Sequence, residues 1–391
     1  MQHGLGLGDA YGATLDRIKA QGGAKARLGM DVLMWITHSR RPLREDEICH
    51  AIAIQIGSDD LNLGDIPTIS TLLGCCQGLA TIDKGTSTIR LIHYTIQDYL
   101  RAHPNHFDRA HSTMAETCLT YLNFQHVRSL PAGPSFDPRS APFLEYSSVY
   151  WGTHMRMEDS EQATKLATKL LNRFDSHLSA KVLWDSICRE FTIVSTPDRK
   201  PFSALHCVSY FGIAEVAESL IKQNRWDVNG TDDGGMTPLI WAARCGHEKV
   251  VRLLLREKQT QPNQQDTNNG RTALSWAAGN GHEGVVRVFL EPQFVTLGNI
   301  GQWWRMGPRV AGRLFRKRYV CPDGLSRSGR TPLSWAAENG HEEVVKLLLQ
   351  REDVNPNRSS KPSQTPLALA IENGHDKVAE LLRARHPRRN R

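Results

Sequence analysis

Five copies of one sequence pattern fill the C-terminal half of the chain. They begin at residues 203, 237, 272, 331 and 365, so their starts lie 34, 35, 59 and 34 residues apart. This feature restricts the fold more than any other, because a unit of such length is one supersecondary element that cannot bury its apolar face alone. Stacked units can bury it together, and the repetition therefore predicts a solenoid.

The positions that recur in each copy are explained by a pair of short helices. Thr237 is a good helix N-cap, and Pro238 has the backbone angle that the first helical turn requires. Leu239 and the two alanines that follow form a narrow apolar side, and Gly246 suits the left-handed residue that ends the helix. Residues 250–255 have the apolar spacing of a second helix.

This pattern is similar to the ankyrin repeat over residues 199–386. The resemblance implies a stack of helix–loop–helix units with projecting turn tips and a concave face that binds protein. Two features depart from the family pattern. The histidine that usually follows Thr-Pro-Leu occurs only as His206, and the 59-residue interval holds about 25 residues more than one repeat. For residues 291–327 we expect either one eroded repeat or a basic loop, with the flanking repeats forming partly separate stacks.

The ankyrin resemblance also implies which residues contact a partner protein. In that family the contacts come from the turn tips and from the residues just before the Gly-His pair, and their chemistry varies between copies. The expected partner-binding residues here are Asp233, Met236, Arg244, Asn268, Asn269, Arg271, Asn280, Arg327, Arg330, Glu338, Asn339, Gln364 and Glu372.

The N-terminal half has the element order of a winged-helix domain. Residues 30–36, 44–55 and 69–73 are expected to be helical, and residues 79–82 and 88–93 flank a Lys-Gly turn that predicts a β-hairpin. Three helices followed by a two-stranded wing are typical of winged helices. A second resemblance is carried by two segments of this half, Arg41 to Glu47 and Ile89 to Leu100.

These two segments resemble the winged helix that follows the NACHT nucleotide-binding domain in fungal NOD-like receptors and in GPI inositol-deacylase-like proteins. The resemblance implies four regions. Residues 1–28 would be the end of a NACHT domain, 29–104 a winged-helix domain, 105–198 a helical linker, and 199–391 the ankyrin-repeat domain with an irregular basic insert at 291–327.

The expected fold is therefore mainly α-helical, with a winged helix and helical linker followed by an ankyrin-repeat solenoid. The family resemblance implies a non-enzymatic scaffold or sensor fragment of a NOD-like receptor that binds a partner protein. Two alternatives stay open. The chain could bind nucleic acid through the winged helix and basic segments, or it could be one piece of a larger signalling NTPase.

The net charge of +7 is confined to two short segments. Residues 305–318 and 383–391 hold eleven Lys and Arg and no acid, so the rest of the chain is negative. The candidate recognition helix, residues 66–78, has no Lys or Arg with which to contact bases or phosphates. This composition favours a structural winged helix over one that binds DNA, and protein over nucleic acid as the partner.

No motif in the sequence indicates catalysis. A phosphate-binding loop requires Gly-Lys, and that dipeptide is absent, so we expect neither nucleotide binding nor hydrolysis. The His-Glu pairs at 247, 282 and 341 lack a second histidine four residues later, which favours inter-repeat hydrogen bonds over metal binding. The recurring tryptophans 241, 276 and 335 favour core packing over a ligand-stacking ladder. We therefore expect no catalytic, cofactor-binding or metal-binding residues.

The composition also bears on the compartment. Apolar stretches fall short of about 18 residues, residues 1–30 lack the apolar block of a secretory signal, and eight cysteines do not make a disulfide scaffold. These features predict a cytoplasmic protein, with the nucleus as a second possibility because of the basic segments. The partner's identity and the oligomeric state are left undecided by the sequence.

Overall fold

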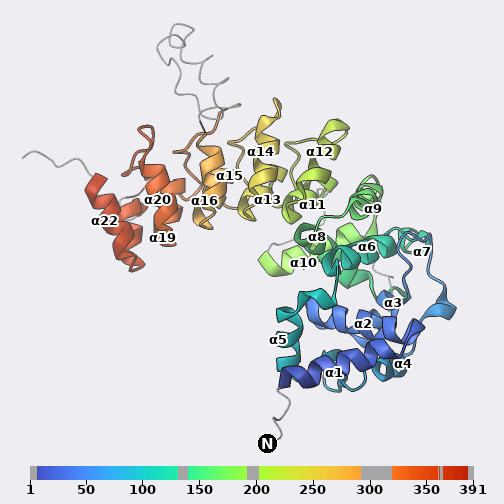
Figure 1. Ribbon diagram of the computed structural model, residues 1–391. Helices are drawn as coiled ribbons and strands as arrows, with labels where there is room; N and C mark the ends of the chain where they lie inside the picture. Colours follow the sequence, from blue (N-terminus) through green and yellow to red (C-terminus); the bar gives the residue numbers. More distant parts are fainter. Residues whose placement is uncertain are drawn as a thin grey trace, which may run out of the picture. The chain divides into compact units, whose positions relative to one another are not determined.

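The computed structural model describes residues 7–130, 140–191, 202–291, 319–359, 361 and 364–385. The chain divides into two compact units, Met1–Glu190 and Phe191–Arg391 (Figure 1). It is mainly helical, as expected, with one two-stranded sheet among the described residues. No helix in these ranges is both long enough and apolar enough to cross a membrane.

The first part of the N-terminal unit is the winged helix. Its elements are α1 (Leu7–Ala20), α2 (Gly23–His38), α3 (Glu45–Ala53), the 3-10 turn η1 (Leu63–Asp65), α4 (Ile69–Cys75), β1 (Ala80–Asp83), β2 (Thr88–Leu91) and α5 (Tyr94–Ala102). The strands pair antiparallel, with Ala80 opposite Leu91 and Asp83 opposite Thr88. Helix α2 packs on α1, α3 and α4, and it buries Val32, Leu33 and Trp35 there.

The second part of this unit is helical throughout. It contains η2 (Pro104–His106), α6 (Ala110–Leu122), α7 (Gln125–Arg128), α8 (Leu144–Met157), α9 (Glu161–Leu171), η4 (Phe174–Ser176) and α10 (Leu178–Phe191). Almost every residue of α6 is buried, because the helix packs on α2, α8 and α9. The packing covers polar as well as apolar side chains of α6, since Ser112, Glu116, Thr117 and Thr120 are also buried.

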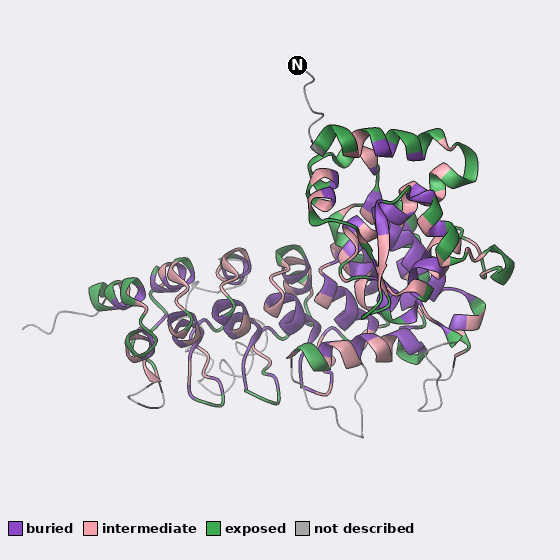
Figure 2. Ribbon diagram, turned by 90° about the horizontal axis from the view of Figure 1, so that it is seen from below, coloured by how far each residue is buried: buried purple, intermediate pink, exposed green. Residues whose placement is uncertain are grey.

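The described part of the C-terminal unit is a stack of five helix pairs. They are α11 (Ala204–Phe211) with α12 (Ala214–Lys222), α13 (Pro238–Arg244) with α14 (Glu248–Arg256), α15 (Ala273–Gly279) with α16 (Glu283–Phe289), α19 (Pro332–Glu338) with α20 (Glu342–Leu349), and α21 (Pro366–Glu372) with α22 (Asp376–Arg385). First helices pack on first helices and second helices on second, which gives two layers (Figure 2).

The ends of each first helix follow the sequence signals. The Thr237 hydroxyl accepts a hydrogen bond from the Ile240 N–H, and the threonines that begin the next three copies cap their helices in the same way. Gly246 has φ of 80°, and a Cβ there would lie 2.8 Å from His282 of the next repeat. Glycine is therefore required at this position both by the backbone angle and by the neighbouring imidazole.

The stack continues across the long interval between the third and fourth copies. Helix α15 packs directly on α19, and α16 packs on α20. The chain re-enters the stack along the preceding repeat, where the Cys321 N–H donates to Asn263 Oδ1 at 2.7 Å and Gln265 donates to the Leu325 carbonyl at 2.7 Å. The expectation of partly separate stacks is therefore wrong. Most of the 291–327 segment, residues 292–318, lies outside the described residues.

Candidate partner-binding surface of the repeats

Each repeat is tied to the one before it by the histidine that opens its second helix. His282 Nε2 donates to the Arg244 carbonyl at 2.8 Å, and His341 Nε2 donates to the Gly279 carbonyl at 3.0 Å. His247 and His375 make the equivalent bonds. The prediction that these histidines are inter-repeat residues is confirmed. No cluster of metal-ligating side chains occurs in the part of the chain that the structure describes.

Two predicted contact residues belong to the same joint. Asn280 Nδ2 donates to the Arg244 carbonyl at 2.9 Å, and Asn339 Nδ2 donates to the Gly279 carbonyl at 2.7 Å. Each of these carbonyls therefore receives two donors from the following repeat. Both asparagines are exposed, but one amide hydrogen of each holds the stack together. Replacing them affects the stack as well as any partner.

The recurring tryptophans are anchored by turn carboxylates in two repeats of the three. The Trp241 indole N–H donates to Asp232 at 2.7 Å, and the Trp276 indole N–H donates to Asp266 at 3.0 Å. Trp241 is fully buried, which confirms its predicted role in core packing, whereas Trp276 and Trp335 are half-buried. Burial raises the pKa of Asp232 to about 6.

The third tryptophan lacks such an acceptor. Ser326 stands five residues before Thr331, as Asp232 stands five before Thr237. Consequently the buried Trp335 Nε1 has no hydrogen-bond partner among the described residues. We expect Ser326→Asp to supply one and to raise the free energy of unfolding by about 1 kcal/mol, the usual net value of a hydrogen bond.

Urea denaturation of the full chain measures this effect, with Asp232→Ser as the reverse variant. The reverse change should destabilise the protein by about 1–3 kcal/mol, because it leaves the Trp241 indole N–H without its acceptor. If Ser326→Asp lowers stability, the comparison between the two repeats is invalid.

Arginine side chains lie between the tryptophan rings. The Arg244 guanidinium is 4.3 Å from the Trp276 ring centroid, and the Arg271 guanidinium is 3.8 Å from the same ring. Arg271 also lies 4.1 Å from the Trp335 ring, and Arg330 covers that ring at 4.8 Å. Guanidinium groups and rings thus alternate along the stack, which is favourable because a cation is attracted to the face of an indole.

The predicted contact residues divide into three groups by exposure. Six are exposed: Asn268, Asn269, Asn280, Arg327, Asn339 and Glu372. Five are half-buried: Asp233, Arg244, Arg330, Glu338 and Gln364. Met236 and Arg271 are buried, with 3% and 7% of their surfaces exposed.

The burial of Met236 and Arg271 corrects the expectation that both are surface tips. Both residues directly precede the N-cap threonine, a position that is buried in these two copies and half-buried at Arg330 and Gln364. The Met236 backbone joins Asp232 in closing the turn, since its N–H donates to Asp232 at 2.9 Å. The Arg271 guanidinium lies over the rings of both Trp276 and Trp335. Their first role is structural, which the sequence did not show.

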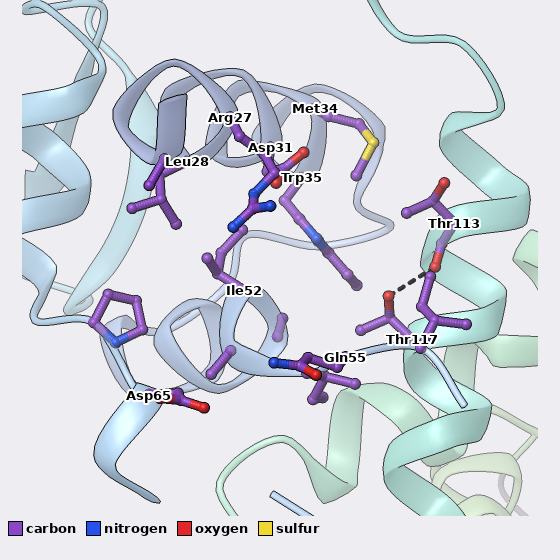
Figure 3. A pocket seen from close by; sticks show the side chains of 16 residues that line it. Arg27, Leu28, Asp31, Met34, Trp35, Ile52, Gln55, Asp65, Thr113 and Thr117 are labelled. Atoms are coloured by element: carbon purple, nitrogen blue, oxygen red, sulfur yellow. Dashed lines mark hydrogen bonds between the residues drawn. The ribbon is translucent and has the colours of Figure 1, made fainter. Parts of the chain in front are cut away.

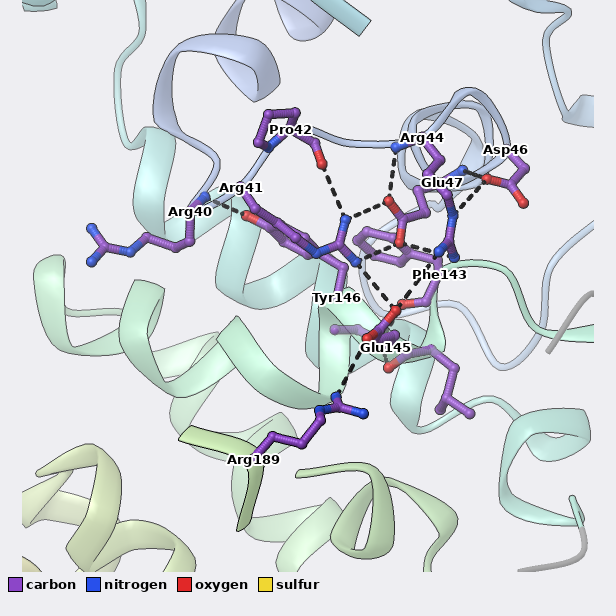
Figure 4. A network of polar contacts seen from close by, with 12 residues as sticks. Arg40, Arg41, Pro42, Arg44, Asp46, Glu47, Phe143, Glu145, Tyr146 and Arg189 are labelled. Carbon is purple, nitrogen blue, oxygen red and sulfur yellow. Dashed lines mark hydrogen bonds and ion pairs between the residues drawn. The ribbon is translucent and has the colours of Figure 1, made fainter. Parts of the chain in front are cut away.

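The N-terminal unit contains a polar network that explains one of the family-like segments (Figure 4). Arg41 makes a bidentate ion pair with Glu47, at 2.7 and 2.6 Å, and Glu47 is fully buried. Glu47 also accepts the Arg44 N–H at 2.8 Å, which caps α3. Glu145 of α8 lies 3.7 Å from both Arg41 and Arg44, so the network joins the winged helix to the following helices.

A chain of hydrogen bonds continues from this network into the helical part. The Arg40 N–H donates to the Tyr146 hydroxyl at 3.2 Å, and that hydroxyl lies 2.9 Å from His154 Nε2. His154 Nδ1 in turn lies 2.9 Å from His111 Nδ1. A hydrogen bond between the two Nδ1 atoms requires a proton on only one of them, so at least one of these imidazoles is neutral. Burial lowers the pKa of His154 to about 3.

A cavity of about 710 Å³ opens between α2, α3 and α6 (Figure 3). Arg27 and Asp31 lie one helical turn apart on its α2 wall, with Gln55 and Thr117 on other sides. Burial raises the pKa of Asp31. No motif in the sequence indicated this cavity, because its walls come from segments that are far apart along the chain.

The wing and its neighbouring helix give little support to nucleic-acid binding. Helix α4 falls within the candidate recognition segment and presents Ser70, Thr71 and Gly74 to solvent. On the wing, the positive charge of Arg90 is paired with Asp83 at 3.0 Å, so Lys84 is the remaining basic side chain of the hairpin. A surface of this kind lacks the arginine and lysine contacts with which proteins bind phosphates.

Comparison with known proteins agrees with this description. Three copies of the ankyrin-repeat model match residues 177–266, 205–299 and 313–390, which together cover about half of the chain. The chain therefore belongs to the ankyrin-repeat family. The model described as "GPI inositol-deacylase, winged helix domain" matches residues 15–118, a longer stretch than the expected 29–104.

One curated protein is similar to part of the chain. BTB/POZ domain-containing protein 3 of Schizosaccharomyces pombe (strain 972 / ATCC 24843) is 31% identical over 103 residues, which is 26% of this chain. The chain covers only 18% of that protein's length.

Proposed function

We propose that this chain is a non-enzymatic interaction protein whose repeats bind a partner protein at their turn tips and first-helix ends. The observation that carries the proposal is the contrast between repeating interior and varying surface. The caps, the Gly-His joints and the buried apolar side chains recur along the stack. The exposed residues differ from copy to copy, as in Asn268 and Arg327.

Such a division suits a rigid scaffold that presents a specific surface. A pre-organised surface loses little conformational entropy on binding, so its contacts are translated more fully into affinity. The second-helix layer is less suited to this role, because many of its charges are paired within the stack. Examples are Arg252 with Glu291 and Glu248, and Lys346 with Glu343.

We extend the proposal to a sensor or scaffold of the NOD-like receptor type. The support is the combination of a winged helix of the GPI inositol-deacylase type with ankyrin repeats in one chain. A cytoplasmic location fits the eight cysteines, which are all free thiols.

The test replaces three exposed tip residues together, Asn268, Asn269 and Arg327, by alanine in the full chain. Partner capture from a lysate of the source cells, quantified against wild type, should fall at least tenfold, while the melting temperature changes by only a few degrees. The matched control replaces Lys249, Arg256 and Lys258, which are exposed on and after α14. Equal loss in both variants, or none in the first, would contradict the proposed binding surface.

A further inference from the structure

The cavity between α2, α3 and α6 is large enough to hold a small organic molecule. Its volume of about 710 Å³ falls within the range of about 300–1,000 Å³ that is usual for ligand sites. The lining residues belong to α2, to α3 with the chain that follows it as far as Pro67, and to α6 (Figure 3). The cavity is therefore built within one compact unit, by helices that pack on one another.

Asp31 gives this cavity a carboxylate whose charge is only partly compensated. The residue is half-buried on α2, and among the described residues none forms an ion pair with its carboxylate or donates a hydrogen bond to it. Burial raises the pKa of Asp31, while the charge of Arg27, one helical turn earlier, lowers it by less. Arg27 is itself exposed to solvent, so it does not neutralise the carboxylate fully.

The end of α3 contributes further negative charge. Ala51, Ile52 and Ala53 line the cavity in the last turn of this helix. Within the described ranges their carbonyls accept no hydrogen bond, as is usual for a helix end that lacks a cap. Such carbonyls form the negative end of the helix dipole, which favours a cation nearby. Asp65 adds a second carboxylate to the lining.

Apolar side chains form another part of the lining. Met34, Trp35 and Ile52 lie along the cavity between the charged groups of α2 and the end of α3 (Figure 3). Contact with these side chains would remove the apolar part of a ligand from water, which favours binding. The cavity thus combines an apolar wall with an excess of negative charge.

We propose that this cavity binds a small organic cation, a protonated amine that is attached to an apolar ring. The ammonium group lies beside Asp31 and the end of α3, and the ring contacts Met34, Trp35 and Ile52. The lining holds two carboxylates and one guanidinium, so an amine is favoured over a ligand with a carboxylate or a phosphate. The inference goes beyond the proposed function, because it does not involve the repeats.

Isothermal titration calorimetry with the full chain tests the inference on four probes. Tryptamine carries an ammonium group, indole-3-ethanol has a neutral hydroxyl instead, and indole-3-propionate has a carboxylate. We expect tryptamine to bind at least tenfold more tightly than indole-3-ethanol, and indole-3-propionate to bind most weakly of the three. The fourth probe, Nα-acetyl-lysine amide, represents a lysine side chain of a protein. It should bind at least tenfold more weakly than tryptamine, because it lacks a ring.

Asp31→Asn should abolish the preference for tryptamine over indole-3-ethanol and leave the affinity for indole-3-ethanol unchanged. The matched control is Asp98→Asn, which changes an exposed aspartate of α5 outside the cavity and should leave both affinities unchanged. Circular dichroism during heating shows whether each variant keeps its fold.

Gln55→Lys and Gln55→Met form a second test that leaves Asp31 in place. Residue 55 is exposed and lines the cavity just beyond the end of α3, so we expect the fold to tolerate both changes. The lysine adds a positive charge, which should weaken tryptamine at least fivefold and strengthen indole-3-propionate. The methionine is neutral and of similar length, and it should preserve the order of the probes.

Three results would overturn the inference: no heat of binding from tryptamine at millimolar concentration, equal affinity for tryptamine and indole-3-propionate, or a folded Asp31→Asn variant that still prefers tryptamine. Tighter binding of Nα-acetyl-lysine amide than of tryptamine would also overturn it, since the ligand would then be a lysine side chain of a protein. If Asp31→Asn does not fold, the effects of Gln55→Lys on the two charged probes decide the question.

Discussion

Acidification from pH 7 to pH 4 is expected to unfold the N-terminal unit. Burial lowers the pKa of His154 to about 3 and that of His177 to about 4, both from an ordinary value of 6.5. In the unfolded chain these imidazoles take up protons below pH 6.5, whereas in the folded unit they stay neutral. Stability from these two groups is therefore complete above pH 6.5 and is lost as the pH falls toward 4.

The expected loss is large compared with the stability of a domain. At about 1.4 kcal/mol per pKa unit, the two histidines together remove about 6 kcal/mol by pH 4. A whole domain is usually stable by only about 5–15 kcal/mol. His38, whose pKa burial lowers to about 4, is half-buried and acts in the same direction.

Hydrogen–deuterium exchange of the full chain between pH 7 and pH 4, corrected for the intrinsic exchange rate, measures this loss unit by unit. Peptides from α6 and α8 should lose protection first. The repeats provide an internal control, because two buried groups there oppose each other. His206 has a pKa lowered to about 4 by burial and destabilises on acidification, while Asp232, with a pKa of about 6, stabilises between pH 6 and 4. Equal protection of α6 at pH 7 and pH 4.5 would refute the prediction.

Glu47→Ala is expected to destabilise the N-terminal unit by about 3–5 kcal/mol, the usual effect of removing one partner of a buried ion pair. The substitution leaves the Arg41 guanidinium without its bidentate acceptor and the Arg44 N–H without its cap. Within the described residues, Arg41 then keeps an ion pair with Glu145 alone, at 3.7 Å and half exposed.

Chemical denaturation followed by circular dichroism provides the measurement. Glu145→Ala is the matched control, because it removes a glutamate from the same network at an exposed position, where ion pairs contribute about 1 kcal/mol or less. Glu47→Gln should lie between the two, since an amide oxygen can still accept the Arg44 N–H. A Glu47→Ala variant within 1 kcal/mol of wild type would show that the network is not a buried joint.

Local signals in the sequence were sufficient to predict the repeats. A threonine cap, a helix-ending glycine and an apolar spacing act within a single helix pair, so their consequences can be derived without the rest of the chain. The winged-helix order was predictable for the same reason. The helices and the hairpin follow one another directly in the sequence, and the acidic first turn of α3 indicates where one helix begins.

Features that depend on two repeats at once were not predictable from one copy. Arg271 stands at the expected place of an exposed turn tip, but Trp276 of its own repeat and Trp335 of the next repeat both contact its guanidinium. Likewise, the spacing of 59 residues gives the length of chain between the third and fourth copies but not the path that the chain takes. It could not show that α15 packs directly on α19. The Arg41 segment was recognised, but its partners Glu145 and Tyr146 lie about a hundred residues further on.

The placement of Arg271 between two repeats also determines what could be exchanged as a module. A segment cut at each cap threonine would separate Arg271 from Trp276, the first ring that it covers, and from Gly279, which makes room for it. For example, the first helix of the fourth copy carries Glu338, which pairs with Arg330 at 2.6 Å. If this helix were placed after Arg271, its glutamate would stand at the position of Gly279. Duplication or recombination of these repeats keeps each arginine together with the helix that follows it when the breakpoints fall before the arginine, for example within the second helices.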